Sequence, residues 1–137
     1  MVKGAVALVL VLLLVPLTAC STSASERGAS TSASVSVTVS WDNASNHIGR
    51  RITVYGPVVD TRYASSSRGQ PTFLNIGKPY PDPGRFTVVI WGENRGNFPS
   101  PPEVYYKGRT IFVTGVVTRY EGVPEIEASD LTQIREQ

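Results

Sequence analysis

Two long segments of this chain alternate in the manner of half-buried strands, and each contains a glycine near its middle. Between residues 51 and 61, aliphatic residues or glycine occupy positions 52, 54, 56 and 58. This two-residue period is typical of a strand with one buried face. Residues 109–120 form a second such segment, which contains Gly115. Because glycine inside a strand indicates a bulge or sharp bend, Gly56 and Gly115 predict that both strands curl, as in a closed sheet.

Three shorter strands are expected at 72–76, 86–91 and 124–128. The second is nearly continuous in Val and Ile, which indicates a central position in the sheet. Glu121-Gly122 predicts a hairpin turn before the last strand. The alternating valines at 35, 37 and 39 are compatible with one further short strand.

Two helical segments are expected beside these strands. Residues 41–47 predict one or two helical turns, with Ser40 as the N-terminal cap and Gly49 closing the turn. A short helix near 102–106 begins at Pro102, a position that proline favours. Five strands with a helical connection between the third and the fourth have the order of an OB-fold barrel, so the predicted class is all-β.

The N-terminus resembles a bacterial lipoprotein signal. Lys3 provides the positive charge, residues 4–16 the apolar run, and Leu17-Thr18-Ala19-Cys20 resembles the lipobox. The run is shorter than the roughly 20 apolar residues of a transmembrane helix, which favours a cleaved signal. The resemblance implies that Cys20, the chain's one cysteine, carries a thioether-linked lipid and fatty-acyl chains such as palmitate. Two or three chains would anchor the protein firmly to a membrane.

This anchor divides the chain into three parts: a signal peptide at 1–19, a tether at 20–37 and one domain at 38–137. The tether is almost entirely Ser, Thr, Ala and Gly, a composition that cannot bury enough apolar surface to fold. The expected location is the cell envelope, outside the cytoplasm. Ser21 stands where the inner-membrane retention signal of such lipoproteins usually has Asp, which indicates the outer membrane if the cell has two.

Several motifs of the domain resemble a family of small bacterial OB-fold domains. The motifs are 49–56 (GRRITVYG), 73–81 (FLNIGKPYP), 86–91 (FTVVIW), 105–108 (YYKG), Gly115 and 124–126 (PEI). Domains of this family occur in secreted or lipid-anchored proteins, sometimes beside nuclease domains, and are described as nucleic-acid-binding-like. The resemblance covers about residues 40–134 and implies an OB fold with a binding role.

The charge of the domain is uneven but modest. Ten Lys or Arg stand against five Asp or Glu from 41 to 119, whereas one Arg stands against five acids from 120 to 137. The body is therefore basic and the tail acidic. A surplus of five positive charges is well short of the strongly basic domains that bind polyanions.

An OB barrel binds ligands on its second and third strands and on the loops between strands one and two and between four and five. Single-stranded nucleic acid requires aromatic rings for bases and cations for phosphates. The residues of these types on the projected face are the candidate ligand contacts: Arg51, Tyr55, Arg62, Tyr63, Arg68, Phe73, Lys78, Arg85, Trp91 and Arg119. The competing interpretation is structural: Phe73 and Trp91 as core, Asn75 as a turn residue, and Tyr80 as a plug against the barrel.

Catalysis has little support in the sequence. His47 is the one histidine, and the serines near residue 66 have no histidine partner at a readable spacing. Glu125 and Glu127 share a strand face, but two carboxylates alone make a poor metal site. We expect no enzyme activity, no cofactor and no metal.

The sequence thus predicts a lipid-anchored binding module for single-stranded DNA or RNA. The alternatives are an envelope module that binds a protein or a glycan, and an accessory to a secreted nuclease. A continuous basic groove beside aromatic rings would favour nucleic acid, whereas an exposed cluster containing Trp91 or Tyr63, with the arginines dispersed, would favour the envelope module.

Overall fold

The computed structural model of this protein describes residues 36–137. The expected signal peptide, the lipidation site Cys20 and nearly all of the tether lie outside the described residues. No helix in the described part of the chain is long and apolar enough to cross a membrane.

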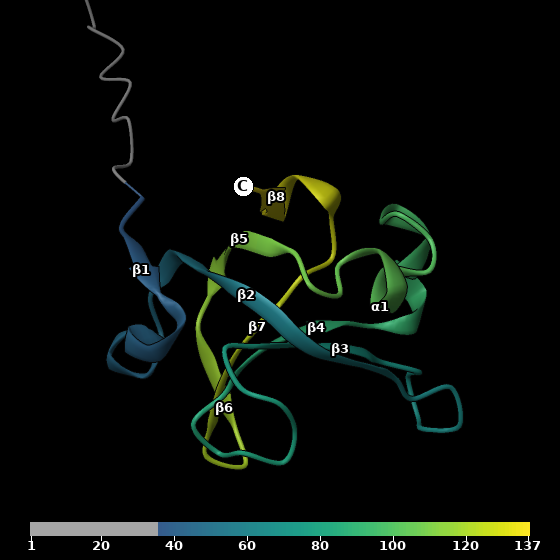
Figure 1. Ribbon diagram of the computed structural model, residues 1–137, viewed down its shortest axis with the longest axis horizontal. Coiled ribbons are helices and arrows are strands. Elements are labelled where there is room, and N and C mark those ends of the chain that lie inside the picture. The colour runs from purple at the N-terminus through teal and green to yellow at the C-terminus, as the bar shows by residue number, and fades with distance from the viewer. Residues whose placement is uncertain (1–35) are drawn as a thin grey trace, which may run out of the picture. The chain divides into compact units, whose positions relative to one another are not determined.

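Strands make up most of the described chain (Figure 1). Its elements, in order, are β1 (Thr38–Ser40), η1 (Trp41–His47), β2 (Arg51–Tyr63), β3 (Thr72–Ile76), β4 (Phe86–Ile90), η2 (Gly92–Asn97), α1 (Pro102–Tyr105), β5 (Thr110–Val116), β6 (Thr118–Tyr120), β7 (Val123–Glu127), η3 (Leu131–Gln133) and β8 (Ile134–Glu136). The three η elements are short 3₁₀ helices. The predicted all-β class is confirmed.

The strands form one mixed, eight-stranded sheet in the order β6-β7-β4-β3-β2-β5-β8, with β1 pairing to β2. Neighbouring strands are antiparallel except for two pairs: β1 runs parallel to β2, and β4 runs parallel to β7. The connection from β4 to β7 includes α1, as a parallel pair requires a long crossover. The hydrogen-bonded order has two open ends, so a closed barrel of five strands is not confirmed.

Most predicted elements are present with small shifts at their ends. The strand at 72–76 and the hairpin turn at Glu121-Gly122 are confirmed, and α1 lies between the third and fourth predicted strands. The long fourth strand is interrupted at Val117, which separates β5 from β6. Ser40 occupies the N-cap position of η1, but its hydroxyl makes no capping hydrogen bond. The final elements, η3 and β8, were not predicted.

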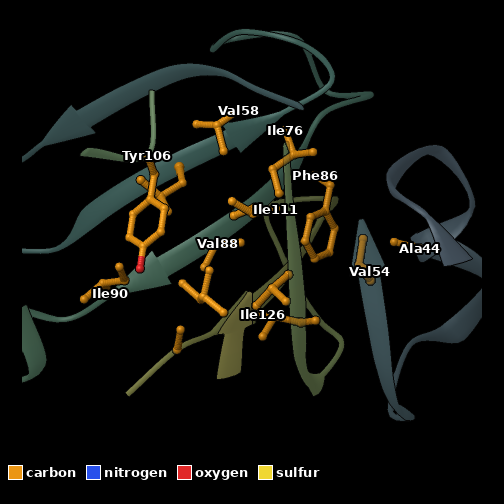
Figure 2. Close-up of a cluster of buried hydrophobic side chains, with 14 of the residues drawn as sticks. Ala44, Val54, Val58, Ile76, Phe86, Val88, Ile90, Tyr106, Ile111 and Ile126 are labelled. Carbon is orange, nitrogen blue, oxygen red and sulfur yellow. The ribbon is translucent and has the colours of Figure 1, made fainter. Parts of the chain in front are cut away.

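The core is one cluster of buried side chains contributed by most of the strands. Figure 2 shows side chains from β2, β3, β4, β5 and β7 converging, with Val88 and Ile111 near the middle. Tyr106, which follows α1, is 1% exposed and reaches the same cluster. Burial raises the pKa of its phenol to about 12.

Strand β2 contains a bulge that the sequence did not predict in this place. Its first half pairs with β5 without interruption, and Gly56 is opposite Ile111. Its second half pairs with β3, and there the register shifts between Val58 and Asp60. A bulge or sharp bend was predicted at Gly56; the bulge lies two to four residues further on.

Gly56 is required for a different reason, the close approach of a tryptophan. A Cβ atom at Gly56 would lie 2.5 Å from the ring of Trp41 and 2.6 Å from Ile76. Gly77 has a positive φ of 78°, and a Cβ there would lie 2.1 Å from the same indole ring. Gly56 on β2 and Gly77 directly after β3 thus leave the space in which Trp41 packs η1 against the sheet.

We predict that Gly56→Ala destabilises the domain by about 1 to 3 kcal/mol, the usual cost of an extra methyl group in a packed region. Gly96→Ala is the matched control, because a Cβ there has no atom within 4 Å. Urea unfolding monitored by tryptophan fluorescence measures both variants. Equal stability of the two would contradict the assigned role of Gly56.

Candidate functional site

A cleft of about 440 Å³ lies on the face of the sheet opposite the core, between a loop and a hairpin. The loop joins β3 to β4 and the hairpin joins β6 to β7; both lie at the bottom of the view in Figure 1. The lining combines aromatic, charged and uncharged polar side chains: Asp60, Thr61, Arg62, Phe73, Asn75, Tyr80, Arg85, Thr87, Tyr120, Glu121, Val123 and Glu125.

The floor of the cleft is a row of polar residues across four neighbouring strands. Asp60 of β2 is opposite Asn75 of β3, Asn75 is opposite Thr87 of β4, and Thr87 is opposite Glu125 of β7. Asn75 Nδ2 donates to Asp60 Oδ2 at 3.0 Å, and Thr87 Oγ1 donates to Asn75 Oδ1 at 3.0 Å. Asn75 and Thr87 are buried, and these bonds satisfy polar groups that would otherwise be costly to bury.

The bulge in β2 is what places Asp60 on this floor. Side chains alternate between the two faces of a strand, so without the extra residue Asp60 would share the core face with Val58. Val59 is that extra residue, and its side chain is exposed. With the shift, Asp60 and then Arg62 lie opposite Asn75 and Phe73, on the cleft side. The carboxylate is thereby kept out of the hydrophobic core.

One wall of the cleft is the loop from Gly77 to Arg85, which is fixed in position by two hydrogen bonds and a cation–π contact. The backbone N–H of Tyr80 donates to Asp60 Oδ2 at 3.2 Å. Arg85 Nη1 donates to the carbonyl oxygen of Asp82 at 2.8 Å, and its guanidinium lies 5.1 Å from the centre of the Tyr80 ring. Among the described residues, Arg85 Nε is the one fully buried side-chain nitrogen or oxygen without a hydrogen-bond partner. Arg85 is thus positioned by a carbonyl and a ring rather than by a carboxylate.

The other wall is the hairpin from Tyr120 to Val123. Glu121 and Gly122 both have positive φ values, 48° and 84°, as a tight turn of the I′ type requires. The Tyr120 side chain is 64% exposed, which leaves its ring free to contact a ligand. Phe73 is half-buried beside Arg62 and completes the set of three rings around the opening.

The charge in the cleft is mixed rather than basic. Two arginines and three carboxylates line it. Burial raises the pKa of Glu125, the neighbouring charge of Glu127 raises it further, and Arg85 partly opposes both effects. Arg85 and Glu125 form no ion pair within 4 Å, although both line the same space.

Of the ten residues predicted to contact a ligand, the structure brings three together in the cleft: Arg62, Phe73 and Arg85. The other seven lie elsewhere. Arg51 lines a shallow depression beside Gly115 and Gln133. Arg68 is exposed in the turn after β2, and Arg119 is exposed on β6, opposite Pro124.

The remaining four predicted contacts take part in packing or pairing within the domain. The guanidinium of Arg95 lies over the Tyr63 ring, 3.6 Å from its centre, and Arg95 also forms an ion pair with Glu103 at 2.9 Å. Lys78 forms an ion pair with Asp82 at 3.6 Å.

Trp91 and Tyr55 contact other groups as well. The Trp91 ring lies against Gly69, where an added Cβ would be 2.9 Å from it. Tyr55 stacks on Phe112 with ring centres 5.5 Å apart, on β2 and β5 away from the cleft.

The sequence reasoning missed most of the acidic and polar part of the cleft. Asn75 was interpreted as a turn residue and Tyr80 as a plug, whereas both line the cleft. Asp60 could have been found from the sequence, because this charged residue occupies a position at which the alternation of β2 predicts an apolar one. Residues 120–123 were projected onto the ligand face as the loop between strands four and five, but Tyr120 and Glu121 were not among the ten candidate contacts, whereas both line the cleft.

No group of three metal-ligating side chains lies within residues 36–137. Arg50 Nη1 lies 3.5 Å from Nδ1 of His47, at the surface of η1. The described residues of the cleft provide three kinds of group that a ligand could contact: aromatic ring surfaces, carboxylate acceptors and guanidinium donors.

No protein-family model and no curated protein matches the chain. Among solved structures, the chain is similar to one described as an aspartyl-tRNA synthetase from Leishmania major Friedlin, with a TM-score of 0.48 and 12% identity over 78% of this chain and 22% of that one. It is also similar to OBody AM1L10 bound to hen egg-white lysozyme, with a TM-score of 0.41 and 17% identity over 67% of this chain and 83% of that one. Aspartyl-tRNA synthetase from Entamoeba histolytica gives a TM-score of 0.41 and 13% identity over 67% and 20% of the two chains.

This chain thus spans about a fifth of the synthetase chains that it matches. Likenesses of this size do not assign a family or an activity, so the site has to be interpreted from its own chemistry.

Glu125 generates a prediction about the pH dependence of stability. A carboxyl group whose pKa is higher in the folded than in the unfolded state destabilises the fold once it is ionised. The free energy of unfolding therefore falls as pH rises through the range between the two pKa values. Glu125→Gln removes the charge, and we expect it to stabilise the domain at pH 7 by no more than about 1 kcal/mol, since the half-exposed carboxyl is screened by solvent.

The advantage of Glu125→Gln should disappear below the ordinary glutamate pKa of about 4.3, where both states of the wild type are protonated. Thermal unfolding of the two proteins at pH 4, 5.5 and 7 measures it. A constant difference across this range would contradict the assigned shift.

Proposed function

We propose that this protein is a binding module of the OB type and that the cleft is its ligand site. The observation that carries the proposal is the cleft itself, in which three aromatic rings surround a floor of hydrogen-bonding side chains. It draws on the second and third predicted strands and on the hairpin between the fourth and fifth. In OB folds these are the positions that bind ligands.

The strand pairing supports the OB assignment. β5 pairs with β2, β6 pairs with β7, and β7 pairs with β4. Only Val117 separates β5 from β6. If these two count as one bent strand, the pairings run around the five predicted strands as in an OB barrel, with β1 and β8 as additions.

We propose binding rather than catalysis, because the sequence has one histidine, no histidine partner for the serines near residue 66, and only two neighbouring carboxylates as candidate metal ligands. Single-stranded nucleic acid is one ligand that this site can be tested for, because Phe73, Tyr80 and Tyr120 offer rings and Arg62 and Arg85 offer cations. An envelope protein or a glycan is the second. The role of accessory to a nuclease would be a special case of the first.

The proposed location is the outer side of a membrane, with lipid on Cys20. We predict that the chain expressed in a bacterium incorporates labelled palmitate and that Cys20→Ala abolishes the label, because that sulfur would carry the lipid. Ser21→Ala is the control and should keep it. Labelled palmitate on Cys20→Ala protein would exclude this anchor.

The cleft is tested by substitution in the full chain, purified in detergent. We predict that Tyr120→Ala weakens ligand binding by about 1 to 3 kcal/mol, the range measured for loss of one stacking ring. Arg62→Ala should weaken it as well if the ligand contacts that guanidinium. Fluorescence anisotropy with labelled single-stranded DNA, RNA and oligosaccharides at two salt concentrations gives the affinities.

Two matched controls distinguish a local effect from a loss of folding. Tyr120→Phe keeps the ring and should bind normally. Arg50→Ala removes an exposed arginine beside η1, outside the cleft, and should also bind normally. If some ligand binds but neither Tyr120→Ala nor Arg62→Ala changes its affinity, the cleft is not the site.

A further inference from the structure

The polar row on the floor of the cleft has unused hydrogen-bonding capacity at both ends. At one end, Asp60 Oδ2 accepts bonds from Asn75 and from the backbone of Tyr80, whereas Oδ1 accepts none from the described residues. At the other end, the carboxyl of Glu125 makes no hydrogen bond to any described side chain or backbone group, although it is half-buried. In the middle of the row, the side chains of Asn75 and Thr87 are hydrogen-bonded to each other.

These two ends lie far enough apart to bind a chain rather than a single small molecule. Asp60 and Glu125 are on strands separated by three strand-to-strand steps, β2 to β3 to β4 to β7. At about 4.8 Å for each step, the row spans about 14 Å. A ligand that contacts both carboxyl groups must therefore be extended across the strands and must donate hydrogen bonds at intervals.

The walls beside this row are suited to flat, weakly polar surfaces. Tyr80 and Tyr120 stand on opposite sides, and Phe73 lies at the end near Arg62. A sugar ring has one such surface, made of C–H groups, and hydroxyls around its edge. The edge hydroxyls can donate to carboxylates while the C–H face packs on an aromatic ring.

The charges in the cleft oppose a chain of phosphates. Asp60, Glu121 and Glu125 are distributed along its length, and the two arginines do not outnumber them. No other lysine or arginine among the described residues lines the cleft. Three of them are paired with acids, Lys78 with Asp82, Arg95 with Glu103 and Arg109 with Glu136. Dispersed arginines are one of the two features expected of the envelope module. The other, an exposed cluster containing Trp91 or Tyr63, is not found, because the Trp91 ring lies against Gly69 and Arg95 covers the Tyr63 ring.

We propose that the cleft binds an uncharged oligosaccharide, laid across β2, β3, β4 and β7, with Asp60 and Glu125 accepting hydrogen bonds from its hydroxyls. This inference rests on the proposed function, since it assumes that the cleft is the ligand site. Asp60 acts as the main specificity residue, because the bulge in β2 fixes its position and its Oδ1 has no hydrogen-bond partner among the described residues. Tyr80 and Tyr120 hold the sugar rings.

The test uses the full chain in detergent and a panel of labelled probes: uncharged oligosaccharides of several monosaccharide types, uronic-acid oligosaccharides, and single-stranded DNA and RNA. We expect an uncharged oligosaccharide to bind with an affinity that changes little between low and high salt, since no counterions are released. Asp60→Asn should weaken it about tenfold, the loss of roughly one charge-assisted hydrogen bond. Asp42→Asn, an exposed aspartate on η1, should have no effect.

Each other outcome overturns a defined part of the proposal. Binding of an oligonucleotide, steeply weakened by salt and by Arg62→Ala, with no binding of uncharged sugars, overturns this inference and leaves the cleft as the ligand site. Preference for the uronic-acid probes over uncharged ones also overturns it. Binding of an uncharged sugar that Asp60→Asn does not weaken removes the assigned role of the polar row. If no probe binds, both this inference and the proposed function fail in their present form.

Discussion

The arrangement of the cleft depends on a single extra residue in β2. This strand of 13 residues pairs with β5 through its first half and with β3 through its second. The shift at Val59 allows the first half to keep its aliphatic residues in the core while Asp60 and Arg62 turn to the opposite face. Bulges of this kind redirect side chains beside binding sites. The same strand therefore contributes both to the core and to the cleft.

The strands of this fold were predictable because their alternation has a physical cause, the burial of one face. The predicted bounds of β3 and β4 agree with the observed ones to within one residue, and Glu121-Gly122 correctly predicted the turn between β6 and β7. The reason for the glycines was not predictable. Gly56 and Gly77 are needed because Trp41 approaches them from η1, a contact between segments that no local pattern records.

The site was predicted less well, for a related reason. Alternation shows which residues leave the core, but it does not show which loops cover them afterwards. Asn75 and Thr87 face away from the core, and yet both are buried beneath the β3–β4 loop and the hairpin. Tyr63 and Lys78 had the right chemistry for ligand contacts, but Arg95 and Asp82 engage them. Which cations are already engaged depends on tertiary contacts.

The division of the sequence into a basic body and an acidic tail does not persist in three dimensions. Because β7 lies beside β4, in parallel, it places Glu125 next to Thr87 and within the influence of Arg85. Because β8 lies beside β5, Glu136 pairs with Arg109 at 2.6 Å. The tail thus neutralises part of the surplus that the body carries, inside the cleft through Glu125 and outside it through Glu136. Net charge summed along a chain describes long-range attraction, whereas the carboxylates and arginines that share one cleft decide which ligand can be bound there.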